Sequence, residues 1–451
     1  MRYLYGLLLV FVFSCKKENA IIINNPTTSI ISTIDTIIKI DSLSLVTTTI
    51  DFNIDGVDKS KFLNSLLSSV SSTIDYTKDG VEHLVMSSSL PNQELSPIHF
   101  IKKNNVWFFD ATYYDVKIGS GRNYDKISDG TYAFCDHGAE LPNGQPWPYG
   151  HIWKFETNGD KLKWTQVSKQ RSFYHSVAIG DINNDGKIDI VGLHMGTYNL
   201  DWKNNNLHAY TNIDDNSYSE NKDIIQEVRG EYGAGSIKII DLDNDGIPEI
   251  IRGDYAKLIY RYSIMIYKYS LTNKRYEIYK IPTDLGEFTD PNVGSTSIKT
   301  LDFDHDGDLD IAIAFEGTKN GIEILENKGD CNFIPNQKFE TTEQIMSFRE
   351  FEVADVNKDG FDDIIIHPFH FGTNFRLVKT YSQNNYGEGI RLENCIWINK
   401  NGKFNFYNKE LKVKNIQPGF LKGFMINGKL KFIGIECTNN VFKLQEIIVN
   451  I

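Results

Sequence analysis

Short apolar runs separated by polar turns fill this chain from about residue 71 to its end. Four of them are Ile188–Leu193, Ile250–Ile251, Leu309–Phe315 and Ile364–Ile366. Such apolar, β-branched runs are typical of buried strands. A second apolar run precedes each of them, at Val177–Ile179, Ile237–Ile240, Ile298–Leu301 and Phe351–Ala354. The pattern predicts an all-β protein made of paired short strands.

An acidic loop joins the two strands of each pair. The loops are D-I-N-N-D-G-K-I-D (181–189), D-L-D-N-D-G-I-P-E (241–249), D-F-D-H-D-G-D-L-D (302–310) and D-V-N-K-D-G-F-D-D (355–363). Oxygen-bearing side chains recur at positions 1, 3, 5 and 9, and position 6 is always Gly. A hard cation such as Ca²⁺ takes six to eight oxygen ligands, and Gly permits the sharp turn that brings position 9 back to the ion.

We therefore predict about four Ca²⁺ sites, each including position 7 of its loop. The predicted site residues are Asp181, Asn183, Asp185, Lys187 and Asp189; Asp241, Asp243, Asp245, Ile247 and Glu249; Asp302, Asp304, Asp306, Asp308 and Asp310; and Asp355, Asn357, Asp359, Phe361 and Asp363. An EF-hand is excluded, because its loop needs Glu at position 12 and helices on both sides. Four acidic turns without metal are the remaining alternative.

The four loops belong to a longer series of repeats. They start at residues 181, 241, 302 and 355, and repeats of this length are typical of propellers. Weaker copies occur at Asp75–His83 and Asp125–Ala133, and a turn at Asn427-Gly428 precedes the apolar segment Lys429–Glu436. These three units keep the turn but have lost ligands. The series predicts seven units, starting near 75, 125, 181, 241, 302, 355 and 423.

These loops, with an apolar strand before each, resemble the FG-GAP/VCBS repeats of seven-bladed β-propellers, which include the integrin α-subunit head. The resemblance covers about residues 74–451 and implies a propeller with its calcium loops on one face. A propeller hides its sheet edges by closing its ring. We expect closure to pair an N-terminal strand with the last blade, which ends at Phe442–Ile451.

The N-terminus predicts an exported, lipid-anchored protein. Residues 1–14 have a positive start and an apolar core too short to span a bilayer, as in a signal peptide. The sequence Val12–Cys15 resembles the lipobox of bacterial lipoproteins, which implies lipidation of Cys15 and, with Lys16 following, the outer membrane. A simple secretory signal is the alternative. We expect a tether at 15–42, a strand and helix segment at 43–74, and the propeller at 75–451.

The net charge and the cysteines restrict which partners and metals the chain can bind. The net charge of −12 opposes nonspecific nucleic-acid binding, and the acidic loops account for most of it. Besides Cys15, the cysteines are Cys135, Cys331, Cys395 and Cys437. Their spacing does not indicate zinc, and it leaves both disulfides and buried thiols open.

A candidate ligand face follows from the far ends of the strands after the loops. The residues expected there are His137, His194, Trp202, Asp254, Tyr255, Glu316, His367, Phe369 and His370. Aromatic faces with a few hydrogen-bonding groups suit sugars or peptides. The alternative is that these residues pack blade against blade. Arg252-Gly253-Asp254 spells an adhesion tripeptide, but its place at a strand end explains it sufficiently.

The expected function is a calcium-stabilised binding or adhesion module for a glycan or protein, at the bacterial outer membrane or cell surface. No nucleophile elbow, phosphate loop or dinucleotide fingerprint occurs. The alternative is a carbohydrate-active lyase or hydrolase that uses His and acidic groups of the ligand face.

Overall fold

The structure is a computed structural model in which every described element is a β-strand. It describes residues 21–25, 28–40, 43–54, 70–88, 97–110, 116–119, 121–138, 150–194, 207–214, 217–226, 235–253, 264–280, 294–316, 320–341, 350–367, 390–391, 396–406, 412–413, 422–438 and 441–449. Across these ranges no helix is long and apolar enough to cross a membrane.

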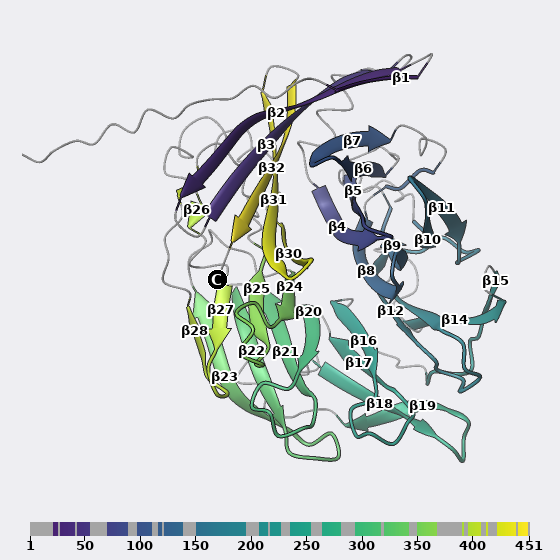
Figure 1. Cartoon of the computed structure of the whole chain (residues 1–451). Coiled ribbons are helices and arrows are strands. Elements are labelled where there is room, and N and C mark those ends of the chain that lie inside the picture. Colours follow the sequence, from purple (N-terminus) through teal and green to yellow (C-terminus); the bar gives the residue numbers. More distant parts are fainter. Residues whose placement is uncertain are drawn as a thin grey trace, which may run out of the picture.

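Seven sheets follow one another around a ring (Figure 1). The first is β4 (Val70–Lys78), β5 (Val81–Ser88), β6 (Ile98–Lys103) and β7 (Val106–Asp110). The second is β8 (Gly121–Ser128), β9 (Thr131–Asp136), β10 (Ile152–Asn158) and β11 (Lys161–Gln166). The third is β12 (Tyr174–Gly180), β13 (Asp189–His194), β14 (Leu207–Asp214) and β15 (Ser217–Glu220).

The remaining blades repeat this order. The fourth is β16 (Ser236–Ile240), β17 (Glu249–Gly253), β18 (Ile264–Ser270) and β19 (Arg275–Lys280). The fifth is β20 (Gly294–Leu301), β21 (Asp310–Glu316), β22 (Asn320–Asn327) and β23 (Phe333–Thr341). The sixth is β24 (Phe351–Ala354), β25 (Asp363–Ile366), β27 (Ile396–Asn399) and β28 (Phe404–Phe406). A separate ladder joins β26 (Ile390–Arg391) to β29 (Lys412–Val413).

The seventh blade combines both ends of the chain. It contains β30 (Lys422–Ile426), β31 (Lys429–Thr438), β32 (Val441–Val449) and β3 (Leu43–Ile54). Strand β3 pairs antiparallel with β32 over a ladder from Leu43↔Val449 to Ile50↔Phe442. The innermost strands touch in the order β4, β8, β12, β16, β20, β24, β30 and again β4, so the ring is closed. The prediction of a seven-bladed propeller closed by an N-terminal strand is confirmed.

The N-terminal segments depart from the expected domain bounds. Residues 21–25 and 28–40, expected within a tether, form β1 (Ile21–Asn25) and β2 (Thr28–Ile40), and β2 pairs with β3. Their many Ile and Thr residues favour strands over a disordered linker. Parts of the segment 43–74 also belong to the propeller blades, because they form β3 and the start of β4. The helix expected around Phe62–Leu67 lies outside the described residues.

The core consists of apolar layers between neighbouring blades. Between blades 5 and 6, for example, Phe303, Phe351 and Trp397 are at most 2% exposed and belong to one cluster. Each blade therefore needs its neighbours to bury its faces.

The three weaker repeats keep their turns as predicted: Asp79-Gly80, Asp129-Gly130 and Asn427-Gly428 link the first two strands of blades 1, 2 and 7.

Candidate metal centres and ligand face

The four acidic loops share one backbone conformation. Gly186, Gly246, Gly307 and Gly360 at position 6 have φ between 81° and 96°, a region that favours glycine. In every loop the N–H of this Gly donates to the position-1 carboxylate, at 2.8 Å in the first loop and 3.2 Å in the third. The N–H of position 7 donates to the position-5 carboxylate. The sequence therefore turns its acidic side chains inward.

The loop from Asp302 fits a hard cation best. Carboxylate oxygens of Asp302, Asp304 and Asp306 lie within 4.8 Å of one another. The Oδ1 atoms of Asp302, Asp304 and Asp308 are buried and have no hydrogen-bond partner in the described part of the chain. Burial, followed by the neighbouring carboxylates, raises the pKa of Asp308 to about 6. A cluster of this kind is destabilised by its own charge, and a divalent cation would relieve it.

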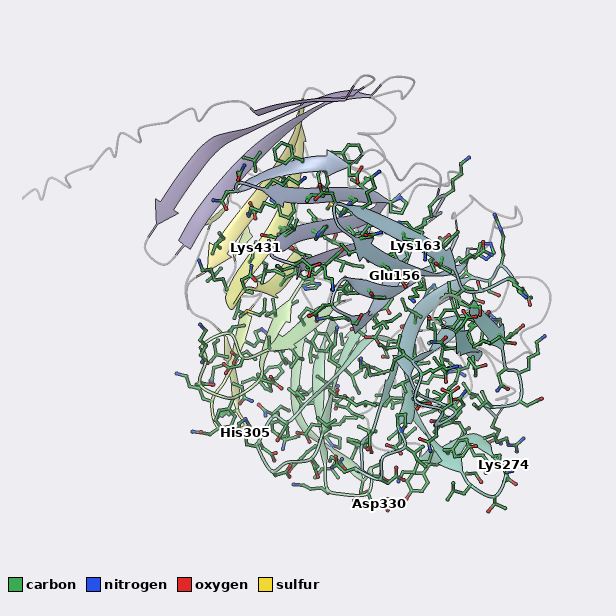
Figure 2. The ribbon with its side chains drawn as sticks, turned by 45° about the vertical axis from the view of Figure 1, so that its right-hand side comes forward. Glu156, Lys163, Lys274, His305, Asp330 and Lys431 are labelled. Atoms are coloured by element: carbon green, nitrogen blue, oxygen red, sulfur yellow. The ribbon has the colours of Figure 1, made fainter. Side chains whose placement is uncertain are left out.

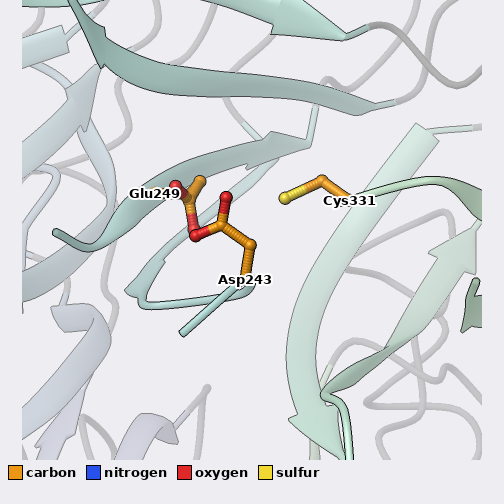
Figure 3. A group of neighbouring side chains, drawn as sticks. All are labelled: Asp243, Glu249 and Cys331. Atoms are coloured by element: carbon orange, nitrogen blue, oxygen red, sulfur yellow. The ribbon is translucent and has the colours of Figure 1, made fainter. Parts of the chain in front are cut away.

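In the loop from Asp241, a lysine side chain competes with a metal ion for one of the carboxylates. Carboxylate oxygens of Asp241, Asp243 and Asp245 also converge within 4.8 Å. Lys268 from β18 forms an ion pair with Asp243. Figure 3 shows that the Cys331 thiol lies beside the carboxylates of Asp243 and Glu249. A thiol is a poor ligand for a hard cation, so the carboxylates of Asp241, Asp243, Asp245 and Glu249 remain the candidate ligands here.

The two loops with Asn at position 3 form internal amide contacts. Asn183 Nδ2 donates to Asp185 at 3.1 Å, and Asn357 Nδ2 donates to Asp359 at 2.9 Å. Their position-5 N–H groups donate to the oxygens of the same two Asn side chains at 3.0 Å. Positions 3 and 5 therefore lie together in these two loops, with one carboxylate fewer than in the other two loops.

Position 9 connects its loop to the rest of the blade. Asp310 accepts the N–H of Phe303 at 3.0 Å with Oδ2 and that of Asn327 at 2.8 Å with Oδ1. Asp189 and Asp363 each accept two backbone N–H groups in the same way. One comes from position 2 of the loop, and the other comes from Asn212 or Asn399 on the third strand of the blade. Burial raises the pKa of Asp310 to about 7, against the opposing effect of these donors. This carboxylate is therefore structural besides being a candidate ligand.

The third-strand Asn residues are functional positions that the sequence interpretation missed. Asn212, Asn327 and Asn399 are buried. The amides of Asn212 and Asn327 donate to the position-8 carbonyl of their own loop, whereas Asn399 Nδ2 donates to the Phe303 carbonyl in the loop of the preceding blade. The loop from Asp241 has Glu249 at position 9, whose Oε2 accepts the N–H of Leu242 at 2.7 Å. An Asn at or near the end of the third strand in blades 3, 5 and 6 was the available signal, but the intervening loops vary in length.

The family comparison agrees with this geometry. The model of the FG-GAP-like repeat matches residues 302–366, which contain the loops from Asp302 and Asp355. The chain is a seven-bladed β-propeller that contains an FG-GAP-like repeat.

The likeness of this chain to whole proteins is limited to distant similarity in fold. No curated protein matches the propeller in sequence. Among solved structures, Trypanosoma rangeli sialidase in complex with the inhibitor DANA is similar at 9% identity and a TM-score of 0.35, over 84% of this chain and 55% of that one. The same sialidase in complex with sialic acid is similar at 8% identity and a TM-score of 0.32, over 97% and 59%. The propeller thus spans somewhat over half of their length, and likeness of this degree says nothing about function.

Two residues of the predicted ligand face are buried in the propeller. His137 is 0% exposed, its Nδ1 lies 2.8 Å from the Gly138 carbonyl, and its ring packs on Phe173. His367 is 1% exposed, and its Nε2 lies 2.8 Å from the Gly423 carbonyl of blade 7. Neither can meet a ligand on an open face, so this part of the prediction is wrong. Both imidazoles are buried between blades, where a backbone carbonyl satisfies one ring nitrogen of each.

The other ligand-face predictions have different outcomes. His194 is half-buried and its ring centroid lies 4.3 Å from that of His208, whose Nδ1 is 3.0 Å from the Tyr174 hydroxyl. Glu316 ends strand β21. Trp202, Asp254, Tyr255, Phe369 and His370 lie outside the described residues. The predicted convergence of these residues stays a prediction.

Cys135 is a buried free thiol, and Cys331 is buried as well. Burial raises the pKa of Cys135 to about 12, which makes this thiol inert.

Proposed function

We propose that this propeller is a calcium-stabilised binding module for a glycan or protein, held at the bacterial outer membrane or cell surface by a lipid on Cys15. The observation that supports the calcium most directly is in the Asp302 loop. Three of its carboxylate oxygens are buried without a hydrogen-bond partner in the described part of the chain. Leaving such atoms uncompensated is costly, and an ion would satisfy all three.

Calcium is the cation that suits these loops. The carboxylates and amides of these loops offer oxygen ligands, which hard cations prefer. Mg²⁺ demands a small octahedral shell, whereas Ca²⁺ accepts more ligands at longer distances. The Asp302 loop should bind Ca²⁺ most tightly, because Asp308 adds a carboxylate and no lysine pairs with its acidic residues in the described part of the chain. Lys268 should weaken the Asp241 site by competing for Asp243.

The positions of the two candidate catalytic histidines favour binding over catalysis. The enzyme alternative relied on His194 or His367 as acid–base groups. His367 is buried and hydrogen-bonded to the neighbouring blade. His194 packs against His208 and Tyr174, whose rings hold it in a local cluster.

Two measurements test the proposal, both on the chain from Lys16. Calorimetric titration should detect about four Ca²⁺ sites, and Ca²⁺ should raise the melting temperature, because it binds only the folded state. Absence of Ca²⁺ uptake at millimolar concentration would refute the metal part. A glycan array together with a pull-down tests the binding part, which fails if neither finds a ligand.

A further inference from the structure

The ring is asymmetric on the face that carries the acidic loops. Each of these loops joins the innermost strand of a blade to its second strand, and so do the short turns of blades 7, 1 and 2. All seven connections therefore lie on one face. Blades 3 to 6 have long acidic loops there, whereas the three neighbouring blades have only two-residue turns. Figure 1 shows β30, β4 and β8 of these blades side by side around the ring.

A cleft of about 240 Å³ lies among the three short turns. Its polar lining comes from Asp75 and Thr77 on β4, Lys126 and Asp129 at the end of β8, and Asn427 between β30 and β31. It adjoins a cavity of about 280 Å³ along the ring axis. The two share Asp75, Lys126, Tyr132 and Met425, so together they reach the lower end of the size range of small-molecule sites.

Two buried polar groups of this cleft have unused hydrogen-bonding capacity. The Asp75 side chain is 0% exposed and pairs through Oδ2 with Lys431 at 2.6 Å, while its Oδ1 has no hydrogen-bond partner in the described part of the chain. Thr77 Oγ1 is likewise buried and unpartnered there. Buried polar atoms are nearly always satisfied in native proteins, so an unsatisfied pair lining a cleft points to a ligand.

Each carboxylate that lines the cleft and its adjoining cavity has a lysine partner. Lys431, which is shared with Glu82 and Glu446, pairs with Asp75, and Lys126 Nζ lies 2.7 Å from Asp129 at the rim. In the axial cavity Lys299 lies 3.1 Å from Glu352. Balanced charge disfavours a bare cation or a phosphate, whereas the mixture of donors and acceptors suits a ligand with many hydroxyl groups. The Tyr132 ring adds an apolar surface of the kind that packs against sugars.

We infer that this cleft over blades 7, 1 and 2 binds a neutral saccharide of one or two rings. The inference rests on the proposed binding function and specifies its ligand class and location. The site lies on the same face as the acidic loops, opposite to the face predicted from the sequence. Thr77 and Asp75 would accept or donate hydrogen bonds to hydroxyl groups at the base, and Lys126 and Asn427 would bind them at the rim.

The test uses the chain from Lys16 in Ca²⁺ and an array of neutral mono- and disaccharides, with uronic acids and sialic acid as an acidic arm. The tightest neutral binder is then titrated against variants. Thr77→Val removes one hydroxyl at nearly constant volume and should weaken binding about fivefold, and Lys126→Ala about tenfold. Thr165→Val and Lys163→Ala, on β11 of blade 2, are matched controls that should change affinity less than twofold.

The outcomes separate the inference from the proposed function. If a neutral saccharide binds but Thr77→Val and Lys126→Ala, with unchanged melting temperatures, bind it like the wild type, the location is wrong. If only acidic sugars bind, or no saccharide binds, the inference is overturned. The calcium titration and the protein pull-down then still test the proposed function independently.

Discussion

Lys431 Nζ lies 2.6 Å from Asp75 Oδ2, across the interface where the last blade meets the first. Lys431 also pairs with Glu82 of blade 1, and Lys102 of blade 1 lies 2.6 Å from Glu446 of blade 7. Figure 2 shows Lys431 on the strands of the last blade. The ring is thus closed by a buried ionic network in addition to the β3–β32 ladder.

Lys431→Met should destabilise the ring strongly. The substitution keeps the apolar stem but leaves the carboxylates of Asp75, which is buried, and Glu82, which is half-buried, without their shared cation. Removing one partner of a buried ion pair costs about 3–5 kcal/mol. Urea unfolding of the variant measures the loss, with the exposed Lys163→Met as control. A loss below about 1 kcal/mol would mean that the network contributes little to closure.

The titration of Asp75 should make stability depend on pH. Burial raises the pKa of Asp75 to about 6 although Lys431 lowers it. The folded state therefore holds this proton more tightly than the unfolded state, so the contribution is full below about pH 4 and is lost as pH rises through about 6. Wild type should lose stability relative to Asp75→Asn between pH 4 and 6.5, and the difference should then be constant.

The pH experiment compares urea unfolding of the two proteins at matched Ca²⁺ concentration. Asp79→Asn, in the exposed turn of the same hairpin, controls for general charge effects. A difference between wild type and Asp75→Asn that does not change from pH 4 to 6.5 would show that the two states bind this proton equally.

Deleting the N-terminal strands should have two distinct effects. Removal of residues 16–42 takes away β1 and β2 and leaves β3 paired with β32. Removal of residues 16–54 also takes away β3 and exposes the edge of β32. We expect a small fall in melting temperature for the first deletion and loss of cooperative unfolding or aggregation for the second. Equal behaviour of the two deletions would contradict closure by β3.

Local sequence predicted the features that depend on local spacing. The loops from Asp181 to Asp363 have their acidic residues and Gly within nine residues, so the turn and the flanking strands followed from the local pattern alone. The bond between Asp310 and Asn327 did not, because its two residues are joined by a connection whose length differs in each blade. The burial of His137 and His367 depends on which blades become neighbours. The cleft depends on Asp75, Lys126 and Asn427 meeting from blades 1, 2 and 7.

The lipid anchor depends on Cys15, which lies outside the described residues. Cys15→Ser should prevent lipidation and move the protein from the membrane fraction to the soluble fraction. A single acyl chain binds membranes only marginally, so the several chains implied by the lipoprotein resemblance are needed for stable attachment. Lys17→Ser is the control and should stay with membranes. If Cys15→Ser also stays there, Cys15 is not the anchor.

Positions 3 and 9 of the Asp302 loop should separate metal binding from folding. Asp304 has a buried oxygen without a partner in the described chain, whereas both oxygens of Asp310 accept backbone N–H groups. Asp304→Asn should therefore weaken Ca²⁺ binding at this site and leave stability in a chelator nearly unchanged. Asp310→Ala should lower stability by about 3 kcal/mol even in a chelator, because hydrogen bonds to charged groups contribute about 1.5–3 kcal/mol each. Calorimetry and urea unfolding measure the two effects, and equal losses in chelator for both variants would contradict this division of roles.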